Sequence, residues 1–258
     1  MARIDSRPAM DTTQPTRAHK RPFVPPVIVR DFPRPPRELV ERFTNAYLPD
    51  ISDRVGPLYT MDSGIRPLYD PMRRLLGVAV TAKLPPSDNL TVQLALAQAR
   101  PGDVLVVDWR GYTEACGTGA GSLSPSIRAG LAGVVADGGW RDIAELQALD
   151  FPIFGRGISP ISAPKARAGE VNVPVCCGGV IVHPGDIILG DREGIVVIPR
   201  RFAAAVADAT DEYELNATLE AWAEDRGKQR SSAKDQVFAD RFLADGGVYF
   251  DTTSDFNG

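Results

Sequence analysis

An alternation of apolar and polar residues near residue 80 predicts the first strand of the chain. Its apolar positions are Val78, Val80, Ala82 and Leu84, and Pro85-Pro86 ends it. Ser87-Asp88-Asn89 can then cap a helix whose apolar face is Leu90, Leu94 and Ala97. The run 104–108 is apolar on both faces and predicts a second, buried strand. A strand, a helix and another strand at this spacing predict a crossover between parallel strands, and therefore an α/β fold.

The second half of the chain alternates short apolar runs with turn residues. It predicts a buried strand at 133–136, a short helix at 143–149 and a strand at 151–154. Apolar runs between residues 171 and 199 are divided by glycine, proline and aspartate turns, which predicts a β-rich subdomain. Helices are predicted at 35–48, from 202 to about 226 and around 237–243.

This pattern predicts three regions. Residues 1–33 have no periodicity and many prolines and basic residues, so we expect a flexible N-terminal arm. Residues 34–200 contain the predicted strands and form the α/β domain, with a β-rich second half. Residues 201–258 form a helical C-terminal extension.

Composition narrows the function classes. The net charge of −4 leaves no basic surplus for nucleic acid. No apolar run approaches the ~20 residues that span a bilayer, so we expect no membrane partner. The three cysteines make no disulfide framework. Cys176 and Cys177 are adjacent and should point to opposite faces of a strand. We therefore expect a cytoplasmic location. With only two histidines in the chain, any metal should be a hard cation held by carboxylate and water.

Two glycine-rich stretches are the candidates for a functional site. Gly117–Ser122 precedes a short predicted helix that begins between residues 120 and 125, with Ser124-Pro125 resembling an N-cap and first helical position. Amides at such a start favour an anion. Asp137–Asp142 follows a buried strand and puts Arg141 beside Asp142, where α/β folds bind ligands. Arg141 could bind the same anion and Asp142 a cation, although a structural ion pair would explain the two residues equally well.

Residues from about Ser52 to Pro199 resemble the RraA-like family, which includes the 4-hydroxy-4-methyl-2-oxoglutarate/4-carboxy-4-hydroxy-2-oxoadipate aldolases. The resemblance lies in blocks that occur in the family's order: Pro86–Asn89, Pro101–Asp108, Gly133–Asp142, Glu170–Val175, Pro184–Asp186 and Gly190–Gly194. It implies a compact α/β core akin to phosphohistidine swivelling domains. It also implies a homotrimer or a dimer of trimers, with sites between subunits.

The resemblance also implies a site. Gly119, Ala120, Gly121 and Ser122 would contact substrate through their amides, Arg141 would bind substrate oxygens, and Asp142 would hold Mg²⁺ or Mn²⁺ largely through water. Glu145 completes the family's Arg-Asp-x-x-acid pattern. The sequence departs from the family at Ala120, where aldolases usually carry an acid, and at Ser122, where they carry a large apolar residue. Asp88, Asp108 and Glu114 are candidate substitutes for the acid, although the sequence favours a turn or capping role for each.

These residues predict a divalent-metal-dependent lyase. Its catalytic residues would be Arg141 and Asp142, and it would cleave or decarboxylate a small 2-oxo acid through a pyruvate enolate. The alternative is a non-catalytic regulatory protein, because some members of the family regulate a ribonuclease.

Overall fold

The structure is a computed structural model that describes residues 24–210, 237 and 240–245. It divides into two compact units, Met1–Asp211 and Glu212–Gly258. In the second unit, Val237 and residues 240–244 are helical, within the helix predicted around 237–243. The part of the predicted 202–226 helix beyond residue 210 lies outside the described residues.

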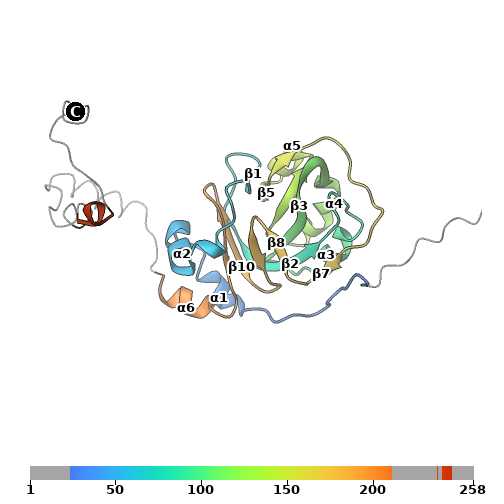
Figure 1. The fold of residues 1–258 in the computed structure, drawn as a ribbon. Coiled ribbons are helices and arrows are strands. Elements are labelled where there is room, and N and C mark those ends of the chain that lie inside the picture. The colour runs from blue at the N-terminus through green and yellow to red at the C-terminus, as the bar shows by residue number, and fades with distance from the viewer. Residues whose placement is uncertain (1–23, 211–236, 238–239, 246–258) are drawn as a thin grey trace, which may run out of the picture. The chain divides into compact units, whose positions relative to one another are not determined.

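Strands dominate the first unit, and most of them join one mixed sheet. They are β1 (Arg66–Pro67), β2 (Leu75–Lys83), β3 (Asp103–Thr118), β4 (Gly133–Trp140), β5 (Ile153–Gly155), β6 (Gly157–Ile158), β7 (Glu170–Val171), β8 (Val175–Cys177), β9 (Val180–Val182), β10 (Ile187–Asp191) and β11 (Gly194–Ile198). The main sheet runs in the order β1-β5-β4-β3-β2-β10-β11, with β6 beside β4 and β7 beside β2. The separate hairpin β8-β9 lies along the concave side of the curved sheet in Figure 1.

The centre of the sheet is parallel. β3 pairs in parallel with β2 from Val78↔Asp103 onward, and with β4 from Val104↔Gly133 onward. A helix connects β2 to β3, so the predicted crossover is confirmed. β10 and β11 extend the sheet in antiparallel pairs beyond β2.

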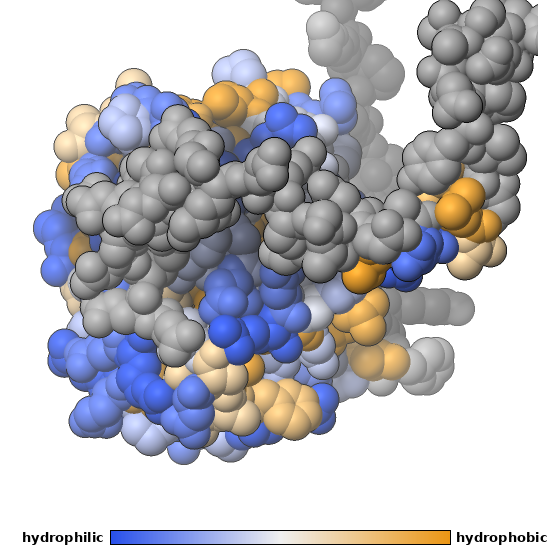
Figure 2. Space-filling view, turned by 90° about the vertical axis from the view of Figure 1, so that its left-hand side faces the viewer, coloured by the Kyte–Doolittle hydropathy of each residue, from blue (hydrophilic) through white to orange (hydrophobic). Residues whose placement is uncertain are grey.

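Helices cover the outside of the sheet in two groups. They are α1 (Arg37–Glu41), α2 (Leu48–Val55), the 3₁₀ turn η1 (Pro57–Tyr59), α3 (Val92–Leu96), α4 (Ala120–Arg128), α5 (Ile143–Ala148) and α6 (Ala203–Asp208). Figure 1 shows α1, α2 and α6 together beside β10, and α3, α4 and α5 beyond β2 and β3. On the α2 side, the part of the surface that is coloured in Figure 2 is largely hydrophilic, with separate apolar patches.

Three apolar clusters hold these layers together. The first lies between the central strands and α3–α5 and includes Leu105, Val107, Trp109 and Trp140. The second fills the inside of the curved sheet and is closed by the β8-β9 hairpin. The third joins α2 and α6 to β10 and β11. Because residues 104–107 alternate between the first two clusters, β3 is buried on both faces, as its sequence predicts.

The region 171–199 is rich in β-structure, but it is not a subdomain. β10 exchanges backbone hydrogen bonds with β2, and β7 pairs with β2 at its other end. The apolar alternation within each short strand is correct, whereas the strand each one pairs with depends on contacts distant in sequence. The β-rich second half is therefore confirmed, but it extends the main sheet instead of forming a subdomain.

Both ends of the α/β domain include residues that were assigned from the sequence to the N-terminal arm or to the C-terminal extension. Val27 and Val29 hydrogen-bond to Val171, and Phe32 is buried in the first cluster. At the other end, α6 packs Ala203 and Val206 into the third cluster, and the compact unit ends at Asp211 rather than at residue 200. In the part of the chain that the structure describes, no helix is long and apolar enough to cross a membrane.

Candidate functional site

The two glycine-rich stretches meet at the ends of β3 and β4. Thr118, the last residue of β3, pairs with Trp140, the last residue of β4. Gly119 and the first turn of α4 follow the first strand, and Arg141 and Asp142 follow the second. The sequence placed the end of the second strand too early, because Asp137-Gly138-Gly139 belong to β4. It correctly placed Arg141 and Asp142 at a strand end.

Asp142 is fixed from two sides. Its backbone has φ 59°, a left-handed conformation that is uncommon for residues other than glycine, asparagine and aspartate, and it begins α5. Its carboxylate Oδ2 accepts a hydrogen bond from the amide of Ala120 at 3.1 Å. A Cβ at Gly119 would overlap this carboxylate, so the glycine is required for space. The carboxylate therefore acts as a cap for α4 from outside that helix.

Arg141 provides the positive charge at the site. Its Nε lies 3.7 Å from Asp142 Oδ1, which is an ion pair but too long for a hydrogen bond. This nitrogen is buried and has no hydrogen-bond partner among the described residues, while 39% of the side chain is exposed. A buried donor without an acceptor is costly, and an oxygen ligand would satisfy it.

The first turn of α4 adds main-chain donors. Ala120 gives its amide to Asp142, and the amide of Ser122 bonds back to Gly119 at 3.1 Å. Gly121 is exposed, and its amide has no intrahelical acceptor at this position. The helix begins at Ala120, within the predicted range of 120–125, and Pro125 lies inside α4 rather than at its first position.

Ala120, where aldolases of the family usually carry an acid, does not lie on an open loop. Instead Ala120 is 8% exposed and belongs to the first apolar cluster together with Leu123. Two further buried polar atoms near the strand ends, Thr118 Oγ1 and Trp140 Nε1, also lack a partner in the described part of the chain.

The other candidate acids have different surroundings. Asp88 is buried, and its carboxylate accepts the amides of Leu90, Ala166 and Arg167 at 2.9 Å each, which fixes the segment before β7. Asp108 Oδ1 accepts the amide of Arg110 at 2.9 Å. Glu145 lies exposed in the first turn of α5, and its role beside Asp142 stays a prediction.

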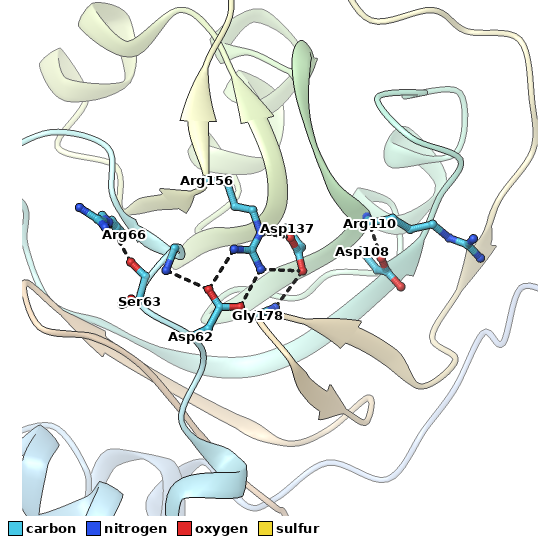
Figure 3. A network of polar contacts seen from close by, with 9 residues as sticks. Asp62, Ser63, Arg66, Asp108, Arg110, Asp137, Arg156 and Gly178 are labelled. Carbon is cyan, nitrogen blue, oxygen red and sulfur yellow. Dashed lines mark hydrogen bonds and ion pairs between the residues drawn. The ribbon is translucent and has the colours of Figure 1, made fainter.

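A polar network on the concave side of β4 was not predicted (Figure 3). Arg156 donates from Nε to Asp137, and from Nη1 and Nη2 to the two carboxylate oxygens of Asp62 at 2.9 and 2.7 Å. Asp137 Oδ2 also accepts the amide of Gly178 at 2.9 Å. The network joins the segment before β1, strand β4 and the β8-β9 turn. Asp137, which precedes Gly138 and Gly139, was the one sequence feature that could have indicated the network. Its partners could not be identified because they lie far away in sequence.

This network is next to the backbone that carries Arg141. The amide of Arg156 donates to Gly138 at 3.0 Å, and the amide of Ser159 donates to Trp140 at 2.8 Å. Between them, β6 pairs with Gly139 and Trp140. The side chain of Arg156 thus anchors the segment that lies along the last residues of β4.

Neighbouring charges and burial shift the pKa values of Asp62, Arg156 and Cys177. The Arg156 hydrogen bond holds the pKa of Asp62 below its usual value, and the two carboxylates raise the pKa of Arg156. Burial, followed by the negative charges of Asp137 and Asp108, raises the pKa of the Cys177 thiol. Cys177 is buried and Cys176 exposed, as expected for neighbours in a strand.

Comparison with known proteins establishes the family. The model of the RraA-like family, described as Aldolase/RraA, matches residues 48–197. The chain belongs to the RraA-like family. A Halalkalibacterium halodurans protein named "Putative 4-hydroxy-4-methyl-2-oxoglutarate aldolase" is 37% identical over 191 residues, which cover 74% of this chain and 86% of that protein.

Solved structures of RraA-like proteins share the fold. The RNA-processing inhibitor RraA from Thermus thermophilis is 29% identical, with a TM-score of 0.54 over 60% of this chain and 93% of that chain. Streptomyces coelicolor RraAS2, titled an unusual member of the RNase ES inhibitor RraA protein family, is 28% identical, with a TM-score of 0.61 over 77% of this chain and 100% of that chain. The mixed α/β fold with its strongly curved sheet is therefore that of RraA-like proteins.

Proposed function

We propose that this RraA-like protein is a divalent-metal-dependent lyase that forms pyruvate from a small 2-oxo acid through an enolate. The observation that carries the proposal is the pair at the end of β4, where Arg141 has a buried Nε without an acceptor beside the fixed carboxylate of Asp142. The 37% identical relative named as an aldolase supports the reaction class.

Arg141 would bind the oxygens on which negative charge develops. When the carbon–carbon bond breaks, its electron pair moves into the enolate of the pyruvyl portion, and a guanidinium fork is a strong donor to such oxygens. Gly121 is an exposed residue, and its amide adds a neutral donor at the start of α4. Asp142, held by Ala120, keeps its second oxygen directed toward Arg141 rather than toward a main-chain amide.

The donor set fits a hard cation. Among the described residues there is no cluster of three or more His, Cys, Asp or Glu side chains that could enclose a metal. Asp142 offers one carboxylate that is 34% exposed, which suits Mg²⁺ or Mn²⁺ retaining most of its water. Such an ion, when bound, polarises the 2-oxo acid as a Lewis acid.

Decarboxylation of oxaloacetate suits the site better than retro-aldol cleavage. Retro-aldol cleavage requires that a proton leave the substrate hydroxyl, whereas loss of CO₂ from oxaloacetate releases the electron pair without that step. With Ala120 buried where aldolases carry an acid, this site has one carboxylate fewer for the proton transfer. We therefore propose oxaloacetate-type decarboxylation as the stronger activity.

The test is pyruvate release measured with and without Mg²⁺, from oxaloacetate and from 4-hydroxy-4-methyl-2-oxoglutarate. Metal-stimulated release from oxaloacetate is expected, and it should be lost in Asp142→Asn. The asparagine tolerates the left-handed backbone and still accepts the Ala120 hydrogen bond, so only the charge is removed. Equal stimulation in this variant would refute the role of Asp142.

A regulatory function is the second candidate. The buried Ala120 and the similarity to RraA inhibitors of RNA processing favour it. A regulator should release no pyruvate from either substrate beyond the rate of the protein-free Mg²⁺ solution, and should instead slow RNA cleavage by a ribonuclease. Pyruvate release that Arg141→Lys abolishes would exclude a purely regulatory protein.

A further inference from the structure

The β9-β10 turn, the end of β11 and the 3₁₀ turn η1 enclose a cavity of about 320 Å³. Its lining consists of Tyr59, Ile181, His183, Asp186, Pro199, Arg200 and Arg201. Neither Arg141 nor Asp142 is part of this lining, so the cavity is separate from the candidate active site.

The carboxylate in this cavity, that of Asp186, accepts hydrogen bonds from main-chain amides. Asp186 Oδ2 accepts the amide of His183 at 2.8 Å, and Oδ1 accepts the amide of Arg200 at 3.0 Å. The amide of Gly185 donates to the carbonyl of Ala79 in β2, and the amide of Ala79 donates to the carbonyl of Asp186. Asp186 therefore fixes the cavity wall, and both of its oxygens are occupied.

The cations in this cavity have no comparable partners. Within the described part of the chain, neither Arg200 nor Arg201 forms a salt bridge or a side-chain hydrogen bond; Arg201 lies over the ring of Phe202 at 4.8 Å. His183 is exposed, and its imidazole N–H is a third donor. Two permanent positive charges thus face a single negative charge, which leaves the cavity net positive.

We propose that this cavity binds a small phosphate-bearing anion. Arg200 and Arg201 would donate to the phosphate oxygens, with His183 as a third donor. A phosphate has enough oxygens to accept from all three groups at once, and guanidinium forks match its geometry. Tyr59 and the exposed Ile181 provide an aromatic and an apolar wall for an organic portion of the ligand.

The experiment is calorimetric titration of the full chain with inorganic phosphate at constant ionic strength. Arg200→Gln/Arg201→Gln is compared with Arg30→Gln/Arg192→Gln, which removes the same charge from two exposed arginines outside the cavity lining. The first variant should weaken phosphate binding by about a hundredfold, because it removes two guanidinium groups whose charge-assisted hydrogen bonds are each worth about tenfold in affinity. The control should bind phosphate as the unmodified protein does.

Several results would overturn the proposal. These are no phosphate binding by the unmodified protein, equal weakening in both double variants, or succinate binding as tightly as phosphate. Circular dichroism checks that both variants fold. Asp142→Asn should bind phosphate normally, so failure of this proposal and failure of the proposed lyase activity are distinguishable.

Discussion

Gly119 has no room for a side chain, because the Asp142 carboxylate occupies the space that a Cβ would need. Its φ of −153° is ordinary extended backbone, so the constraint is spatial rather than conformational. Gly121, two residues later, would place a Cβ in open space. These two glycines of one motif therefore make a matched pair for testing the site.

Gly119→Ala should displace Asp142, break its hydrogen bond with Ala120 and lower metal-stimulated kcat/KM by about 10²-fold, comparable to the loss of one preorganised transition-state contact. Gly121→Ala keeps the main-chain amide and should lose far less activity than Gly119→Ala, and it should gain up to about 1 kcal/mol in unfolding free energy, since alanine favours helices over glycine. Steady-state kinetics and urea denaturation measure both effects. Equal activity in the two variants would show that the position of Asp142 does not matter.

Arg141→Lys keeps the positive charge but loses the planar fork. We expect kcat/KM for oxaloacetate to fall by about 10²-fold, as when one oxyanion donor is removed. The unfolding free energy should change little, because the side chain is 39% exposed and its ion pair is long. Near-normal kinetics would reduce Arg141 to a structural partner of Asp142.

Among the secondary-structure elements, the Asp62–Arg156–Asp137 network ties β4 to two segments that are remote in sequence. Arg156→Met should cost about 2–3 kcal/mol of unfolding free energy, below the 3–5 kcal/mol for a fully buried pair because Arg156 and Asp62 are partly exposed. Arg37→Met is the control, since its pair with Glu41 is highly exposed and should contribute little to the unfolding free energy. Similar losses in the two variants, measured by urea denaturation, would contradict this role.

The same network predicts a dependence on pH. The Arg156 hydrogen bond lowers the pKa of Asp62 in the folded protein, so the folded state binds its proton less readily than the unfolded chain. The stabilisation is complete above the unfolded pKa of about 3.9 and is lost as pH falls through the lower folded pKa. The stability difference between the unmodified protein and Asp62→Asn should therefore shrink in acid. A constant difference from pH 7 to pH 3 would contradict the linkage.

Local sequence patterns predicted which helices and strands exist. They predicted less well where these elements end and which other elements they contact. The crossover between β2 and β3 followed from apolar alternation and spacing. The face of α3 did not: the helix buries Val92 and Leu96 and leaves Leu90 and Leu94 exposed. At the site, the position of Arg141 and Asp142 followed from one strand end. The Ala120 hydrogen bond, the buried side of Ala120 and the Arg156 network arise from tertiary packing, which no local pattern encodes.

For the whole molecule, the three apolar clusters indicate where the folded unit ends. Their buried members lie between Phe32 and Ala207. A chain ending at Asp211 should therefore fold with one cooperative transition and with a Tm close to that of the full chain. Thermal unfolding followed by circular dichroism checks this. A large drop in Tm would show that residues after 211 stabilise the unit, and activity of the shortened chain shows separately whether they serve the reaction.

The two neighbouring cysteines of β8 should differ strongly in their rates of alkylation. Cys176 is exposed, so an alkylating reagent should modify it as fast as it modifies a free thiol. Cys177 points into the curved sheet beside Asp137, and it can react only when the hairpin swings away from that interior. Intact-protein mass spectra show the fast adduct of Cys176 and the slower adduct of Cys177 separately. The rate of the slower adduct measures how often the β8-β9 hairpin leaves the concave side of the sheet. Cys116 is also buried, so its Cys116→Ala variant assigns the slow adduct to the hairpin.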